Sequence, residues 1–325
     1  MAGHSFYDQI AANRRNSFLL AVVVVVLLGA LGFSIGFALT GDAAGGIGTT
    51  IAAIGLGVAM SLGSYFAGDR LVLTVSGAKE VDEASRPQLL NVVREMTLAA
   101  NVPMPKVYVI DDSAPNAFAT GRDPKHASIA VTTGLLDKLD REELQGVIGH
   151  ELSHVRNFDI RFSLIVGVLV GSIALLSDFF LRWSWFGGDR RSRSDREGGG
   201  GLQAIMMLVA IVLAILAPIF ARLVQLAVSR QREYLADASS VELTRNPYGL
   251  EQALAKIASD KEVLEVANRA TQHLYFTNPI KKFEARSSSL FSTHPPIVER
   301  INRIRQLTGE RPLASSDEAA LAELE

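Results

Sequence analysis

The sequence predicts a mainly α-helical integral membrane protein with four transmembrane helices and an α+β domain that contains a small sheet. Of the 325 residues, 48% are hydrophobic and 20% are charged, which is too apolar for an ordinary soluble domain. The excess lies in four stretches, each long enough at about 20 residues to cross a bilayer. The segments between and after them have the composition of a folded soluble protein.

Residues 1–69 are expected to form a short head and a membrane hairpin, with spans at about 17–39 and 45–67. The first apolar run exceeds the roughly 7–15 residues of a signal-peptide core, so we interpret it as a retained anchor. Arg14 and Arg15 precede it and favour a cytoplasmic N-terminus. The pair Gly32 and Gly36 is either a helix-contact face or a chance pair in a Gly-rich span.

The soluble domain is expected in two parts, 70–161 and 230–313, separated by a second hairpin at 162–229. In the first part, "KVYVI" and "ASIAVTT" are typical of strands, "APNAFATGRD" between them of an edge strand, and the stretch after Pro87 of a helix. The hairpin spans are expected at about 162–181 and 202–224. A buried soluble helix is the alternative for the earlier one, and 314–325 is expected to be a frayed acidic tail.

Composition also excludes some site chemistries. The chain has no cysteine, so disulfides and thiolate zinc sites are ruled out. The net charge of −2 gives no reason to expect nucleic acid as a partner.

The stretch "QGVIGHELSHVRNFD" contains the pattern His-Glu-x-x-His at His150, Glu151 and His154. On a helix the two histidines project from one face and can share a metal ion, with Glu151 placed beside it as a general base. Asp140 and Glu143 form a capping-box pattern that predicts this helix. The alternative is a histidine pair on an exposed helix face.

A catalytic zinc needs a third protein ligand. Glu233 and Asp237 are spaced i, i+4, so one carboxylate can bind the metal while the other orients a ligand imidazole, unless both simply lie on an exposed acidic face. The two spans between His154 and Glu233 are an even number, so both residues lie on one side of the membrane. The arginines of the loop 182–201 fit this orientation poorly.

Other candidates follow from their local setting. His294, before two prolines, either stabilises an oxyanion or caps a helix. Asn116 either holds substrate backbone beside the edge strand or is a turn residue after Pro115. Asp159, within about a turn of His154, either orients that ligand or ends the helix.

The segments "PNAFATG", "VTTGLL", "EELQGVIGHELSHVRNFD", "REYLAD" and "FSTHPPIVERI", with their hairpins, resemble the HtpX-type membrane zinc metalloproteases, which are related to the CAAX prenyl endopeptidases. The resemblance implies a gluzincin-like domain on the cytoplasmic face of the cell inner membrane, one Zn²⁺ held by His150, His154 and Glu233, and Glu151 as base. It also implies that Asp237 supports a ligand. After "YLAD" the family often has a Gly-Ala pair where this chain has Ser240 and Val241.

The function implied by the resemblance is zinc-dependent endoproteolysis of misfolded or damaged membrane proteins in stress-related quality control. Its expected partners are protein or peptide substrates and the lipid bilayer, with self-cleavage and homo-oligomers left open. The alternatives are a CAAX-type prenyl-peptide processing enzyme, a catalytically silent zinc-binding membrane scaffold, or a transporter or channel. Few ionisable residues within the spans argue against the last of these.

Overall fold

The predicted fold class is confirmed by a computed structural model that describes residues 6–186, 200–260, 262, 276 and 294–322. The chain divides into two compact units. One, here called the sheet-containing unit, comprises 1–13, 66–162 and 229–325; the other, the helical unit, comprises 14–65 and 163–228. The boundaries between the units fall inside four long helices.

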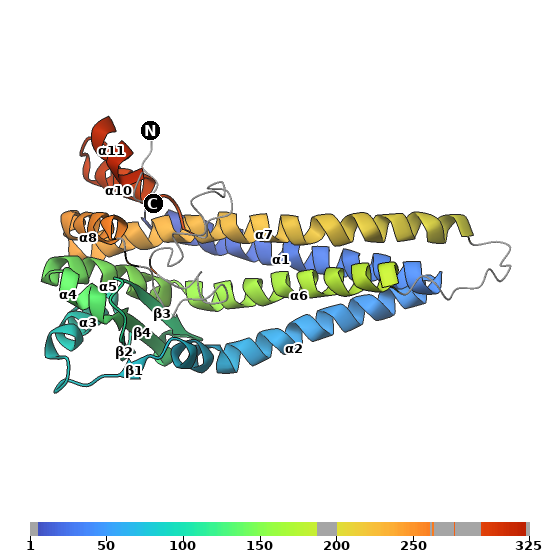
Figure 1. Ribbon diagram of the computed structural model, residues 1–325, viewed down its shortest axis with the longest axis horizontal. Coiled ribbons are helices and arrows are strands. Elements are labelled where there is room, and N and C mark those ends of the chain that lie inside the picture. Colours follow the sequence, from blue (N-terminus) through green and yellow to red (C-terminus); the bar gives the residue numbers. More distant parts are fainter. Residues whose placement is uncertain (1–5, 187–199, 261, 263–275, 277–293, 323–325) are drawn as a thin grey trace. The chain divides into compact units, whose positions relative to one another are not determined.

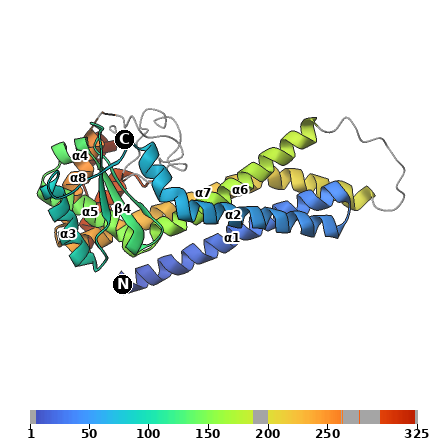
Figure 2. The same cartoon turned by 90° about the horizontal axis from the view of Figure 1, so that it is seen from below.

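The helical unit is built from long apolar helices that run side by side (Figures 1 and 2). They are parts of α1 (Phe6–Thr40), α2 (Ala43–Val75), α6 (Asp159–Phe186) and α7 (Gly200–Thr244). Four helices in the described part of the chain are long and apolar enough to cross a membrane, at Phe18–Thr40, Ala43–Val75, Ile165–Trp185 and Gly201–Thr244. Most of the Arg-rich loop between the last two lies outside the described residues.

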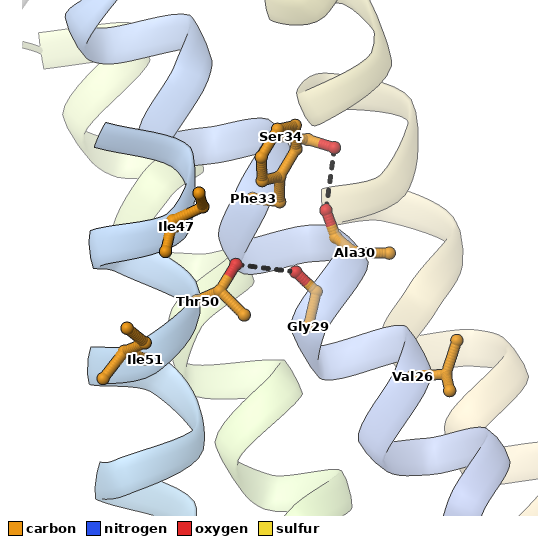
Figure 3. Close-up of a pocket in the computed structure, with 8 residues that line it drawn as sticks. All are labelled: Val26, Gly29, Ala30, Phe33, Ser34, Ile47, Thr50 and Ile51. Atoms are coloured by element: carbon orange, nitrogen blue, oxygen red, sulfur yellow. Dashed lines mark hydrogen bonds between the residues drawn. The ribbon is translucent and has the colours of Figure 1, made fainter. Parts of the chain in front are cut away.

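Helices α1 and α2 approach closely where small residues meet. A Cβ added to Gly36 would collide with Gly45 and lie 2.5 Å from Oγ1 of Thr49, and one added to Gly32 would lie 3.1 Å from Cα of Thr50. Thr50 also donates from Oγ1 to the carbonyl of Gly29 at 3.2 Å, beside a hollow of about 480 Å³ (Figure 3). The Gly32/Gly36 pair therefore lies in a helix contact, where the backbones come close because no side chain separates them.

Gly36→Ala is expected to lower the melting temperature in detergent, because the new methyl overpacks the helix contact by about 1–3 kcal/mol. Gly55→Ala is the matched control, since nothing lies within 4 Å of a Cβ at that position of α2. It should leave the melting temperature unchanged or slightly higher. Equal melting temperatures for the two variants would contradict the close contact.

The sheet of the sheet-containing unit has four strands in the order β1-β2-β4-β3. The strands are β1 (Lys79–Glu80), β2 (Lys106–Ile110), β3 (Ala117–Gly121) and β4 (Ala127–Thr132). β2 and β4 are parallel, whereas β1 and β3 pair antiparallel with their neighbours. β3 is an edge strand, as its sequence predicts, and its Phe118 is fully buried in a cluster with Ile110 and Ala130.

Helix α5 is the central helix of this unit. It packs against α3, α8 and β3 (Figure 1). Segments of α1, α2, α6 and α7 belong to this unit. Its other helices are α3 (Pro87–Ala100), α4 (Thr133–Lys138), α5 (Arg141–Arg156), α8 (Pro247–Ser259), α10 (Ile297–Thr308) and α11 (Ser315–Ala322). Asp140 and Glu143 form the predicted capping box, which satisfies the free N–H groups at the start of α5.

The end of α7 docks on α5 through a serine. Ser240 is fully buried and donates from Oγ to the carbonyl of Gly146 at 2.6 Å. Its Oγ would lie 2.9 Å from a Cβ at Gly149, so the contact exists because that residue has no side chain. Ser240 is thus accommodated by a glycine on the facing helix.

The acidic tail differs from the expectation of a frayed segment. Residues Ser315–Ala322 form α11, and Asn302 of α10 holds it by donating from Nδ2 to Glu318 at 2.7 Å. Oδ1 of Asn302 also accepts from the backbone N–H of Leu313 at 2.8 Å. Asn302 thus hydrogen-bonds both to α11 and to the backbone just before it. These contacts are distant in the chain, so local sequence does not indicate them.

Candidate active site

Helix α5 brings His150 and His154 together. Their Nε2 atoms are 3.1 Å apart, and the ring centroids are 4.8 Å apart with the rings nearly perpendicular. His150 is completely buried, and Glu151 is 2% exposed. The i, i+4 spacing on a regular helix is sufficient to produce this arrangement.

Glu233 reaches the same place from α7. Its Oε2 lies 3.6 Å from Nε2 of His150, and its Oε1 lies 3.5 Å from Nε2 of His154. The three ligand-type atoms all lie within 4.8 Å of one another. Oε2 of Glu233 is buried and has no hydrogen-bond partner among the residues that the structure describes. Two imidazole nitrogens and a carboxylate therefore converge on one point.

Each imidazole is oriented from its other nitrogen by a carboxylate. Asp237 Oδ1 lies 2.9 Å from Nδ1 of His150, and Asp159 Oδ2 lies 3.1 Å from Nδ1 of His154. When Nδ1–H of a neutral imidazole donates to its carboxylate, Nε2 keeps a lone pair, and in both histidines this atom faces Glu233 and can bind a metal ion. The structure thus places Asp237 beside His150 and gives Asp159 the equivalent contact with His154.

Arg300 of α10 is a site residue that the sequence reasoning missed. It is 1% exposed and forms a two-pronged contact with Asp237, from Nε at 2.8 Å and from Nη2 at 2.6 Å. Its Nη1 lies 3.7 Å from Oε2 of Glu233. One signal was present: Arg300 falls on the apolar stripe of Ile297, Ile301 and Ile304, where an unpaired charge would be costly.

Residues 83–308 match peptidase family M48. The chain belongs to peptidase family M48. Two relatives named Protease HtpX homolog, from Streptococcus gordonii and Streptococcus pneumoniae, are 44% and 46% identical over 301 and 302 residues, covering 93% of this chain and 99% of each relative. A solved structure of S. mikatae Ste24p is similar with a TM-score of 0.49 and 18% identity, over 78% of this chain and 57% of that chain.

The family resemblance predicted from the sequence is confirmed, and the chain is a membrane metalloprotease that acts on peptide or protein substrates. In this M48 protease, burial raises the pKa of Glu151, although the neighbouring His150 and His154 oppose the shift. The backbone of Ala119 in β3 also opposes the shift, to a smaller extent than the two histidines. A carboxyl with a raised pKa can both take and return a proton near neutral pH.

The pKa of His154 is raised well above its ordinary value. Burial alone would lower it, but hydrogen bonds to Asp159 and Glu233 outweigh that effect. A metal ion competes with this proton for the same Nε2 atom, so its binding releases the proton.

His294 lies close enough to the site for the charges of Glu233 and Arg300 to change its pKa. It is 6% exposed, and burial lowers its pKa, while the charges of Glu233 and Arg300 act on it in opposite directions. The structure therefore brings His294 into the neighbourhood of the candidate ligands.

Asn116 lies at the start of β3, and its side-chain oxygen accepts from the backbone N–H of Ala117 at 3.0 Å. The carbonyl of Ala117, which faces away from β4, accepts from the N–H of Phe276 at 2.7 Å. The ring of Phe276 meets that of His150 edge-on, with the centroids 4.8 Å apart. The outward-facing carbonyl of Ala117 is thus already hydrogen-bonded to Phe276 of the same chain, a contact that the sequence alone did not indicate.

Arg300→Met is expected to lower the free energy of unfolding by about 3–5 kcal/mol, because the buried charge of Asp237 would lose its guanidinium partner. Denaturant unfolding in detergent measures this. Arg303→Met on the same helix is the control, since half-exposed Arg303 pairs with Glu299 and lies over the ring of Tyr234, and its loss should lower stability by no more than about 1–2 kcal/mol. Equal losses in the two variants would show that the buried pair is not needed.

Proposed function

We propose that the chain is a zinc-dependent endopeptidase in which His150, His154 and Glu233 hold one Zn²⁺ and Glu151 is the general base. The convergence of the three ligand atoms within 4.8 Å, beside a buried carboxylate, is the observation that carries this proposal. Asp237 supports the site through Nδ1 of His150.

The spacing of the ligand atoms supports zinc. Ligands bound at about 2.0–2.2 Å to a tetrahedral zinc ion lie about 3.4 Å from one another. The two Nε2 atoms are 3.1 Å apart, and Glu233 approaches them with different oxygens, Oε1 at 3.5 Å from His154 and Oε2 at 3.6 Å from His150. Two imidazoles and one carboxylate are also a common ligand set of catalytic zinc.

The charge balance supports a divalent cation. Four buried carboxylates surround the site, and two buried guanidiniums oppose them, with both histidines neutral as ligands. The group consists of Glu151, Asp159, Glu233 and Asp237 with Arg232 and Arg300. Two negative charges remain, which is the charge that one Zn²⁺ neutralises.

When bound, zinc acts as a Lewis acid and makes water a nucleophile near neutral pH. Glu151 takes a proton from the attacking water and returns it to the leaving amine. Its burial and raised pKa suit both steps. His294 is proposed to stabilise the oxyanion, and Asn116 to hold the substrate backbone.

We further propose that the sheet-containing unit, which is then the protease unit, faces the cytoplasm from the inner membrane and cleaves misfolded or damaged membrane proteins. Arg14 and Arg15 support a cytoplasmic start of the first span, and the two spans before His150 return the chain to the same side. The relatives named Protease HtpX homolog support the proteolytic role.

Glu151→Gln is expected to keep one zinc per chain and to lose at least about 100-fold in casein cleavage and self-cleavage, because the amide cannot accept the proton. Metal analysis and a cleavage assay on the purified full chain measure both. Glu233→Ala is the matched variant and should lose zinc as well as activity. Cleavage at the parental rate by Glu151→Gln would refute its role as base.

The absence of cysteine allows a direct test of orientation. Ser259→Cys in the protease unit should react with a membrane-impermeant maleimide only after cells are opened, whereas Ser194→Cys in the loop between the last two spans should react in intact spheroplasts. Labelling in the opposite pattern would place the protease unit on the outer side of the membrane.

A further inference from the structure

The turn between α5 and α6 carries the second orienting carboxylate. Asp159 is the first residue of α6, and its Oδ2 contacts Nδ1 of His154 at 3.1 Å. Phe158 before it has a φ of 59°, a left-handed conformation that is unfavourable for a bulky side chain. Such a turn keeps its shape only when the surrounding structure holds it, so the aim of Asp159 depends on tertiary contacts.

Arg232 of α7 supplies these contacts. Its Nη1 donates to the backbone carbonyl of Asp159 at 2.8 Å and lies 3.3 Å from Oδ1 of the same residue. Its guanidinium lies over the ring of Phe162, 3.8 Å from the centroid. Arg232 and Asp159 are 5% and 3% exposed. One guanidinium thus restrains both the backbone and the carboxylate of Asp159.

Both imidazoles are therefore supported by a carboxylate that is itself held by a buried arginine. The two arrangements differ in one respect. Arg300 contacts the side-chain oxygens of Asp237, whereas Arg232 also bonds the main chain of Asp159. Arg300 mainly neutralises its partner, and Arg232 in addition fixes the corner at which α5 gives way to α6.

We propose that Arg232 is a positioning residue for the metal centre: it holds the α5–α6 turn so that Asp159 directs Nε2 of His154 toward Glu233. This rests on the proposed function, in which His154 and Glu233 bind zinc. Arg232 acts through Asp159. A planar guanidinium suits the task because it offers several donors in a rigid plane, which a lysine does not.

The test measures the affinity of the full chain in detergent for Zn²⁺ alone, by competition with a chelator. Arg232→Ala should raise the dissociation constant for zinc about 10–100-fold, the range for loss of a residue that supports a metal ligand. Arg232→Lys should recover part of this loss, because it keeps the charge and a donor. Arg222→Ala is the control on the same helix, where the side chain donates to Gln225, and should change the constant less than about twofold.

A second readout separates positioning from general stability. If Arg232 only stabilised the fold, its removal would lower the melting temperatures of the metal-free and zinc-loaded chains equally. Positioning predicts instead a smaller rise in melting temperature on adding zinc. If Arg232→Ala does not fold, Arg232→Lys and Asp159→Asn undergo the same measurements, and both should bind zinc more weakly than the parental chain.

The outcomes distinguish this inference from the proposed function. Parental zinc affinity in the foldable Arg232 variants, with zinc binding lost in Glu233→Ala, would overturn the positioning role and leave the proposed function in place. A parental chain that binds no zinc would overturn the proposed function itself.

Discussion

The neutralisation of buried carboxylates is the physical constraint on which the site depends. Glu151, Glu233, Asp159 and Asp237 lie together with almost no access to solvent. An ionised carboxylate in such a place is unstable unless a counter-charge and hydrogen bonds surround it. Arg300 meets this need for Asp237, and Arg232 meets it for Asp159. These carboxylates and arginines come from α5, α6, α7 and α10, so the packing of the four helices is what brings the opposite charges into contact.

Helix α7 contributes most of the partners, and their spacing explains why. Arg232 and Glu233 are neighbours, and Asp237 and Ser240 follow about one and two turns later. The register of α7 along α5 therefore sets several contacts at once. The hydrogen bond from Ser240 to Gly146 fixes this register. It can form because Gly149 has no side chain, so Ser240 can approach α5 closely at this point. A slide of one turn would separate Glu233 and Asp237 from the histidines together.

The edge strand β3 links the sheet to the candidate site. The carbonyl of its Ala117 accepts from the N–H of Phe276, and the carbonyl of Phe276 accepts from Arg300 at 3.1 Å. The ring of Phe276 also meets that of His150 edge-on. The edge strand, the buried arginine and the histidine pair thus belong to one connected network.

Sequence by itself determined the features that depend on residues close together in the chain. The four apolar spans, the strands at 106–110 and 127–132, the capping box and the shared face of His150 and His154 all follow from local pattern. Sequence spacing also paired Glu233 with Asp237 but did not decide which carboxylate faces Nε2 and which faces Nδ1. Only the tertiary structure decided that, and it alone revealed Arg300, Arg232 and Phe276. These contacts join residues distant in the chain, and their energy arises from burial and charge pairing, which exist only once the helices have packed.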